Sequence, residues 1–213
     1  MDGMYNLAEI SAETSEIEQI ESAIASASKA TINYHNITHD DMLNGDGLRV
    51  VLWVAGCSHK CPGCHNPQTW DAKSGIPFTE WEESEFWTWL AKPWIQGATF
   101  SGGDPLFCSN RNFISDMMRR VKERYPNKDI WLYTGYTLEQ DNEGFYFADG
   151  SDIFRYEGLQ YIDILVDGKF DQKQRETDLF NHKQVQWRGS SNQRIIDVKQ
   201  TLQNNCIVER RNK

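Results

Sequence analysis

From Arg49 onward, short apolar runs alternate with segments that have a helical repeat of hydrophobic residues. Four runs predict strands, and the first is apolar throughout, as in a strand buried on both faces. The four runs are Val50–Ala55, Ala98–Ser101, Asp129–Tyr133 and Ile162–Val166. Strands separated by helical segments predict parallel pairing in an α/β sheet or barrel. In such folds the working residues lie at the carboxyl ends of the strands.

The two helical segments between these strands carry their own start and stop signals. Thr79 and Glu82 have the spacing of a capping box, and this helix is expected to end before Pro93. The second helix carries Ile114, Met117, Met118, Val121 and Tyr125 at helical spacing. Basic residues near its carboxyl end suit the helix dipole, and Pro126 is expected to stop it.

The segments outside this alternation differ in composition. Residues 1–30 hold six acidic residues and one lysine, and Ile17, Ile20, Ile24 and Ala27 share one helical face. We therefore expect an acidic helical extension over 1–32, lying on the domain surface or docking elsewhere. The polar, glycine- and aspartate-rich residues 139–152 predict a loop. The chain is polar after Arg194, which leaves a domain over 33–196 and a loose tail over 197–213.

Composition and charge exclude several classes of protein. The 213 residues suit one soluble domain, with 39% hydrophobic and 25% charged residues. The net charge of −9 argues against a nucleic-acid or membrane-surface partner. The longest apolar run, Val50–Ala55, is far shorter than the roughly 20 residues of a membrane span. With no signal-peptide pattern at the amino terminus, we expect a cytoplasmic protein.

Three of the five cysteines lie within eight residues, directly after the first predicted strand. Cys57, Cys61 and Cys64 form a C-x3-C-x2-C motif, and thiolates at such spacing bind zinc or an iron–sulfur cluster. A zinc site would need a fourth ligand, such as His59 or His65, and usually pairs two distant knuckles. A four-iron cluster on three cysteines leaves one iron open to substrate. A fourth ligand from Cys108 would instead make an electron carrier.

Other unusual motifs follow the remaining strands: Gly102-Gly103-Asp104-Pro105, Thr134-Gly135-Tyr136 and Asp167-Gly168-Lys169. With the cysteine motif, they make the chain resemble the radical S-adenosylmethionine superfamily. Within it, the chain is most similar to the activating proteins of anaerobic ribonucleoside-triphosphate reductases. Further matching segments are 33–35, 44–49, 129–131, 166–170 and 187–193. The sequence departs from that branch at Asp46, where proline is usual, and at His65, where tyrosine is usual.

The resemblance implies a fold and a set of binding residues. The fold would be α/β, a partial parallel (β/α) barrel of the radical-SAM type with the amino-terminal helical extension. The cofactors would be a [4Fe-4S] cluster and S-adenosyl-L-methionine. The cluster ligands implied are Cys57, Cys61 and Cys64. The residues implied to bind S-adenosylmethionine are Gly63, Cys64, His65, Gly102, Gly103 and Asp104, with the carboxylate of Asp104 receiving the methionine ammonium group.

The resemblance also implies a reaction. A low-potential donor such as a flavodoxin would reduce the cluster, and S-adenosylmethionine would be cleaved to methionine and a 5′-deoxyadenosyl radical. That radical would remove hydrogen from a glycine of the reductase, so no side-chain general base is expected and no catalytic residue is assigned. Asp167 and Lys169 resemble a pair that binds a cation and the substrate loop in the pyruvate formate-lyase branch. The alternative for these two residues is a surface ion pair.

Three other functions remain open from the sequence. The same chemistry could serve another glycyl-radical enzyme of the pyruvate formate-lyase type, because Cys64-His65-Asn66 matches that branch. A zinc-stapled binding module and a closed iron–sulfur electron carrier are the rivals from other classes.

Overall fold

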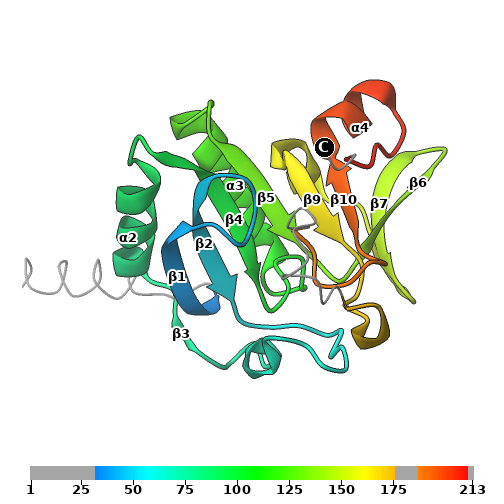
Figure 1. The fold of residues 1–213 in the computed structure, drawn as a ribbon, viewed down its shortest axis with the longest axis horizontal. Helices are drawn as coiled ribbons and strands as arrows, with labels where there is room; N and C mark the ends of the chain where they lie inside the picture. Colours follow the sequence, from blue (N-terminus) through cyan, green and yellow to red (C-terminus); the bar gives the residue numbers. More distant parts are fainter. Residues whose placement is uncertain (1–31, 176–186, 211–213) are drawn as a thin grey trace, which may run out of the picture.

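The computed structural model describes residues 32–175 and 187–210. Its centre is a seven-stranded sheet with the order β10-β9-β5-β4-β2-β1-β3 (Figure 1). The bounds of these strands are β1 Asn33–Asp41, β2 Leu48–Val54, β3 Ile76–Pro77, β4 Ile95–Gly102, β5 Asp129–Tyr133, β9 Ile164–Asp167 and β10 Arg194–Asp197.

The four predicted strands are confirmed as β2, β4, β5 and β9, and they pair in parallel as neighbours. The register joins Val51 to Thr99 and Thr99 to Trp131. The carboxyl ends of these strands therefore lie at one edge of the sheet, where the sequence motifs continue the chain. The described sheet is mixed and open, since β1 and β10 pair antiparallel and its edges are β10 and β3. The described residues therefore form an open, mostly parallel sheet where a parallel barrel was expected.

Both helices predicted between the strands are confirmed, as α2 (Glu80–Leu90) and α3 (Arg111–Arg124). Their buried residues pack with Val50, Leu52 and Val54 of β2 in the main hydrophobic core. A third helix, α4 (Val198–Asn204), adds Val198 to the same core. These helices therefore cover one face of the central sheet. In the described residues no helix has the length and apolar character needed to cross a membrane.

The amino terminus of α2 is stabilised by a capping box formed by Thr79 and Glu82. Thr79 accepts a hydrogen bond from the Trp81 amide, and Glu82 accepts one from the Thr79 amide at 2.8 Å. Replacing Thr79 with alanine is expected to reduce the free energy of unfolding by about 1 kcal/mol, because helix amide groups lose their cap. Urea unfolding at pH 7 measures the change. An unchanged midpoint would contradict the assigned cap.

The same cap is expected to weaken in acid. Burial acts to raise the pKa of Glu82, but the hydrogen bonds from Thr79 outweigh it and lower the pKa. A lowered pKa in the folded state gives stability that is present above the ordinary value of 4.5 and is lost as the pH falls through the folded pKa. The destabilisation caused by Thr79→Ala should therefore shrink as the pH falls below 4.5 and through the folded pKa of Glu82.

Two segments expected to be irregular are ordered, and both predictions are wrong. Residues 139–152 belong to a second, three-stranded antiparallel sheet of β6 (Thr137–Asp141), β7 (Gly144–Asp149) and β8 (Asp152–Phe154). Leu138 and Phe147 face each other across β6 and β7 and are fully buried, which holds this sheet against the main core. The tight turns at the strand ends account for the glycines and aspartates that suggested a loop.

The chain after Arg194 is not a loose tail, because it forms β10 and then α4. Asp197 caps α4 by accepting a hydrogen bond from the Gln200 amide at 2.9 Å, and Val198 and Thr201 are buried. The expected amino-terminal helix lies outside the described residues except for Ile32.

The opposite face of the central sheet carries a fully buried arginine. Arg49 on β2 donates to the Thr99 hydroxyl at 2.7 Å and the Ala98 carbonyl at 2.7 Å, and it pairs with the Asp129 carboxylate at 2.7 Å. Its guanidinium lies 5.5 Å from the centre of the Trp131 ring. Burial lowers the pKa of Arg49, and Asp129 opposes that effect. This arginine joins three neighbouring strands from one side.

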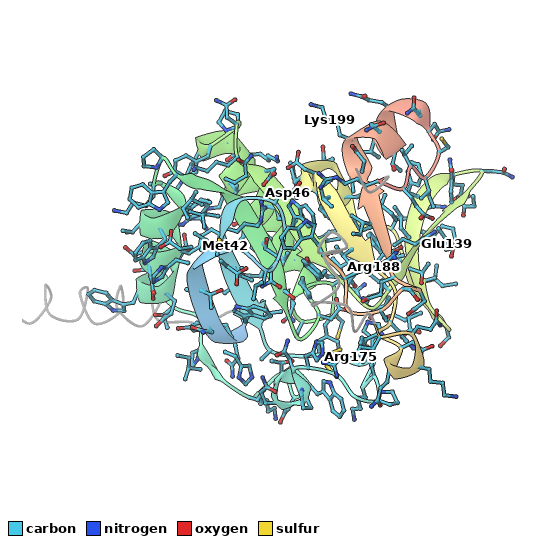
Figure 2. All side chains as sticks on the ribbon, viewed as in Figure 1. Met42, Asp46, Glu139, Arg175, Arg188 and Lys199 are labelled. Atoms are coloured by element: carbon cyan, nitrogen blue, oxygen red, sulfur yellow. The ribbon has the colours of Figure 1, made fainter. Side chains whose placement is uncertain are left out.

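Asp46, which departs from the resembled branch, has a structural role. It accepts hydrogen bonds from Trp187 Nε1 at 2.9 Å and from the Arg210 guanidinium at 2.6 Å. Figure 2 labels the side chain of Asp46 and that of Arg188, which belongs to the segment before β10. Asp46 therefore joins the loop between β1 and β2 to the segment that precedes β10 and to the chain after α4.

Candidate functional site

The three cysteines lie on the loop that follows β2, here called the cysteine loop (residues 56–66). Its start is held by two backbone hydrogen bonds, from Gly56 to the Thr69 carbonyl at 2.7 Å and from Cys57 to the Trp70 carbonyl at 3.0 Å. The loop turns at Lys60 and Gly63, where φ is 46° and 73°. A side chain at Gly63 would come within 2.7 Å of Gln172. The loop therefore passes close to the chain that follows β9.

Backbone amides act on the cysteine sulfurs. The Asn66 amide donates to Cys64 Sγ at 3.4 Å. The amides of His59 and Lys60 act to lower the pKa of Cys57, and that of Phe170 acts to lower the pKa of Cys61. All three cysteines are free and half-buried. Burial raises the pKa of the Cys57 thiol to about 12, with Asp104 adding to the effect, and burial also raises the pKa of Cys61. The thiols of Cys57 and Cys61 therefore remain protonated at neutral pH unless a metal replaces the proton.

The spacing of the three sulfurs argues against a single metal ion. Sulfurs that share one zinc ion lie at most about 4.6 Å apart, because each Zn–S bond is about 2.3 Å. In the described residues, the one group of three metal-ligating side chains within 4.8 Å is Cys57, His59 and Asp104. The three motif cysteines therefore do not all approach one another closely enough to bind one ion. Three thiolates that do not converge on one ion can instead be ligands to different metal atoms of a cluster.

The glycine pair after β4 brings a second motif against the cysteine loop. Gly103 donates to the Val54 carbonyl at 2.7 Å, and Asp104 donates through its amide to the Gly56 carbonyl at 2.7 Å. A side chain at Gly102 would lie 2.6 Å from the Val54 nitrogen, and one at Gly103 would lie 2.5 Å from the Gly56 oxygen. The glycines are therefore needed where the two strand ends meet.

The carboxylate of Asp104 is only 1% exposed and is occupied by protein donors. It accepts from the Thr134 hydroxyl at 2.9 Å, the Gly135 amide at 2.8 Å and the Leu106 amide at 2.8 Å. His59 Nε2 lies 2.7 Å from Oδ2, the carboxylate oxygen that also accepts from Gly135. The expectation that this carboxylate directly receives an ammonium group does not suit this environment. Asp104 instead joins the cysteine loop to the chain that follows β5.

His59 is the residue whose importance sequence reasoning missed. Its two ring nitrogens contact Asp104 at 2.7 Å and Asp149 at 2.8 Å, and its side chain is 2% exposed. Burial acts to lower the pKa of His59, but the hydrogen bonds to Asp104 and Asp149 outweigh it and raise the pKa. The position of His59 between two motif cysteines was the available signal. Its partner Asp149 lies at the end of β7, in the segment expected to be a loop.

The other predicted residues lie in different surroundings. His65 is exposed, and its ring centre lies 5.4 Å from that of Phe170. Asp167 is 1% exposed and pairs with Arg194 at 2.5 Å, so it is removed from the surface. Lys169 is exposed and pairs with Asp149 at 2.6 Å. Asp167 and Lys169 therefore have different partners. Of the two, only Lys169 is linked to the cysteine loop, because its partner Asp149 also contacts His59.

Comparisons with known proteins agree with a cluster-binding chain. Residues 43–196 match the family model described as a 4Fe-4S single cluster domain. The chain is 44% identical, over 77% of its length and 93% of the relative, to the anaerobic ribonucleoside-triphosphate reductase-activating protein of Enterobacteria phage T4. It is 40% identical to proteins of the same name from Vibrio cholerae and Escherichia coli K12. These matches cover 77% and 76% of this chain and 97% and 96% of the relatives.

Proposed function

Since the chain belongs to the family of anaerobic ribonucleoside-triphosphate reductase-activating proteins, we propose that it installs a glycyl radical on such a reductase. The proposed activity is that of a radical-SAM oxidoreductase, which cleaves S-adenosylmethionine to methionine and a 5′-deoxyadenosyl radical. The radical then removes a hydrogen atom from one glycine of the partner. A low-potential donor such as a flavodoxin would supply the electron.

The observation that carries this proposal is the arrangement of the three motif cysteines. They lie on one loop at the carboxyl edge of the parallel strands, and their sulfurs are too far apart to share one ion. We propose Cys57, Cys61 and Cys64 as the ligands of a [4Fe-4S] cluster. When bound, such a cluster supplies a low-potential electron and an iron that no cysteine occupies. The exposed Cys108 and Cys206 are not part of the proposed ligand set.

The neighbouring backbone is proposed to bind S-adenosylmethionine. Gly63, Cys64 and His65 lie at the third cysteine, while Gly102 ends β4 and Gly103 follows it beside the start of the cysteine loop. Exposed His65 is available to contact the adenosine part of the cofactor. Asp104 is proposed to act indirectly, since its carboxylate is bonded to Thr134, Gly135 and His59. The proposed domain spans residues 33–196, with α4 packed against it.

One experiment separates this proposal from its rivals. The protein is reconstituted with iron and sulfide without oxygen, reduced with dithionite, and incubated with S-adenosylmethionine. We expect four irons per chain and 5′-deoxyadenosine by chromatography. One zinc and no iron would favour a binding module, and iron without cofactor cleavage would favour an electron carrier.

The protein target requires a second measurement. The reduced protein and S-adenosylmethionine are mixed with an anaerobic ribonucleotide reductase or with a pyruvate formate-lyase, and a glycyl radical is sought by electron spin resonance. The 40–44% identity to reductase-activating proteins leads us to expect the signal with the reductase. A signal only with the formate-lyase would overturn the proposed partner.

A further inference from the structure

We propose that His59 is a positioning residue whose imidazole holds the cysteine loop in the conformation that directs two backbone N–H groups at Cys57 Sγ. The inference rests on the proposed function in one respect, since it takes Cys57 as a cluster ligand. It is carried by the contacts of His59, which belong to three segments far apart in the sequence.

The first evidence is the pair of hydrogen bonds on the imidazole. Nε2 contacts the Asp104 carboxylate at 2.7 Å, and Nδ1 contacts the Asp149 carboxylate at 2.8 Å. Each ring nitrogen therefore has a carboxylate oxygen as its hydrogen-bond partner. Asp104 lies two residues after the end of β4, and Asp149 ends β7 of the small sheet. His59 thus joins the cysteine loop to two separate parts of the fold.

The second evidence is the packing around the ring. Tyr136 lies edge-on to the imidazole, with the ring centres 4.7 Å apart, and its hydroxyl donates to Asp152 at 2.6 Å. A side chain at Gly135 would come within 2.3 Å of the His59 ring. The site therefore accepts the imidazole in one position, with a glycine on one side and a fixed aromatic ring on another.

The consequence concerns the backbone beside His59. Lys60 has a φ of 46°, which is unfavourable for a residue with a side chain and needs support from its surroundings. In this conformation the amides of His59 and Lys60 oppose the effect of burial on the Cys57 thiol and act to lower its pKa, as N–H groups directed at the sulfur do. Hydrogen bonds to the sulfurs of a cluster stabilise its reduced form, which carries more negative charge. They therefore raise its reduction potential. Releasing His59 should therefore make the potential of the cluster more negative.

The test compares four variants of the reconstituted protein. His59→Phe keeps a ring but removes both hydrogen bonds. His39→Phe is the matched control, because His39 is exposed and stacks on Trp89 instead. Asp149→Ala removes one anchor of the imidazole, and Asp149→Asn retains a side-chain amide whose oxygen can accept from Nδ1. Both changes at Asp149 also break its ion pair with Lys169, so their difference isolates the contact with His59.

The readouts are iron content, the midpoint potential from a redox titration followed by spin resonance, and the rate of 5′-deoxyadenosine formation. We expect His59→Phe and Asp149→Ala to shift the potential to more negative values and to slow the rate on the order of tenfold. Asp149→Asn should restore most of both properties, and His39→Phe should match the wild type. If the His59→Phe variant binds no iron, the role of His59 is decided by whether Asp149→Ala and Asp149→Asn differ in midpoint potential and in rate.

Two failures are distinguishable. A wild-type protein that assembles no four-iron cluster would overturn the proposed function. A wild-type protein that assembles the cluster and cleaves S-adenosylmethionine, with potentials unchanged in His59→Phe or equal in Asp149→Ala and Asp149→Asn, would overturn the role of His59 alone.

Discussion

Replacing Cys57, Cys61 or Cys64 with alanine is expected to reduce 5′-deoxyadenosine formation below detection. Each cysteine supplies one of three proposed thiolate ligands, and each sulfur lies on the same loop at the carboxyl edge of the sheet. A cluster held by two cysteines would lose iron or its electron-transfer competence. The measurement is chromatography of the nucleoside after reconstitution and reduction, together with iron analysis of each variant.

Cys108→Ala is the matched control for these three variants. Cys108 follows the Gly102-Gly103-Asp104 segment but is exposed, and it is not proposed as a ligand. We expect this variant to bind iron and to form 5′-deoxyadenosine as the wild type does. Loss of either property in Cys108→Ala would show that the ligand assignment is wrong and would favour a closed electron-carrier cluster.

Arg49→Met is expected to lower the free energy of unfolding by about 3–5 kcal/mol, because it leaves buried acceptors without their partner. The guanidinium of Arg49 is bonded to Thr99, the Ala98 carbonyl and Asp129 across three strands. Methionine fills part of the volume but donates no hydrogen bond. Chemical denaturation followed by tryptophan fluorescence measures the change.

Arg119→Met is the control for the loss of an arginine. Arg119 also makes two ion pairs, with Asp116 and Glu123, but they lie on the exposed surface of α3. Exposed ion pairs contribute little, so its effect should be much smaller than that of Arg49→Met. Equal effects in the two variants would mean that burial of Arg49 does not produce the destabilisation.

The sequence predicted the central strands and the edge that carries the motifs. Apolar runs such as Val50–Ala55 are typical of strands buried on both faces, and this pattern predicted β2 and its neighbours. The same argument placed the cysteine motif and Gly102-Gly103 at the carboxyl ends of paired strands. The parallel register of β2 and β4 confirms that these two motifs follow adjacent strands.

The small sheet and the environment of Asp104 were not predictable in the same way. Residues 139–152 alternate weakly, and the turns around Gly144 and Gly150 dominate their composition. The partner of Phe147 in the core is Leu138, which lies outside that segment. Sequence also cannot tell which way a carboxylate points. The burial of Asp104 depends on Thr134 and His59, which the fold brings from separate loops.

The most direct test of the account is spin resonance of the reduced protein with S-adenosylmethionine labelled with ¹⁵N at its amino group. The central claim is that three cysteines leave one iron of the cluster available to the cofactor. We predict that the labelled nitrogen couples magnetically to the reduced cluster and that the coupling is retained in Cys108→Ala. A reduced four-iron cluster whose spectrum shows no coupling and does not change on adding S-adenosylmethionine would contradict the account.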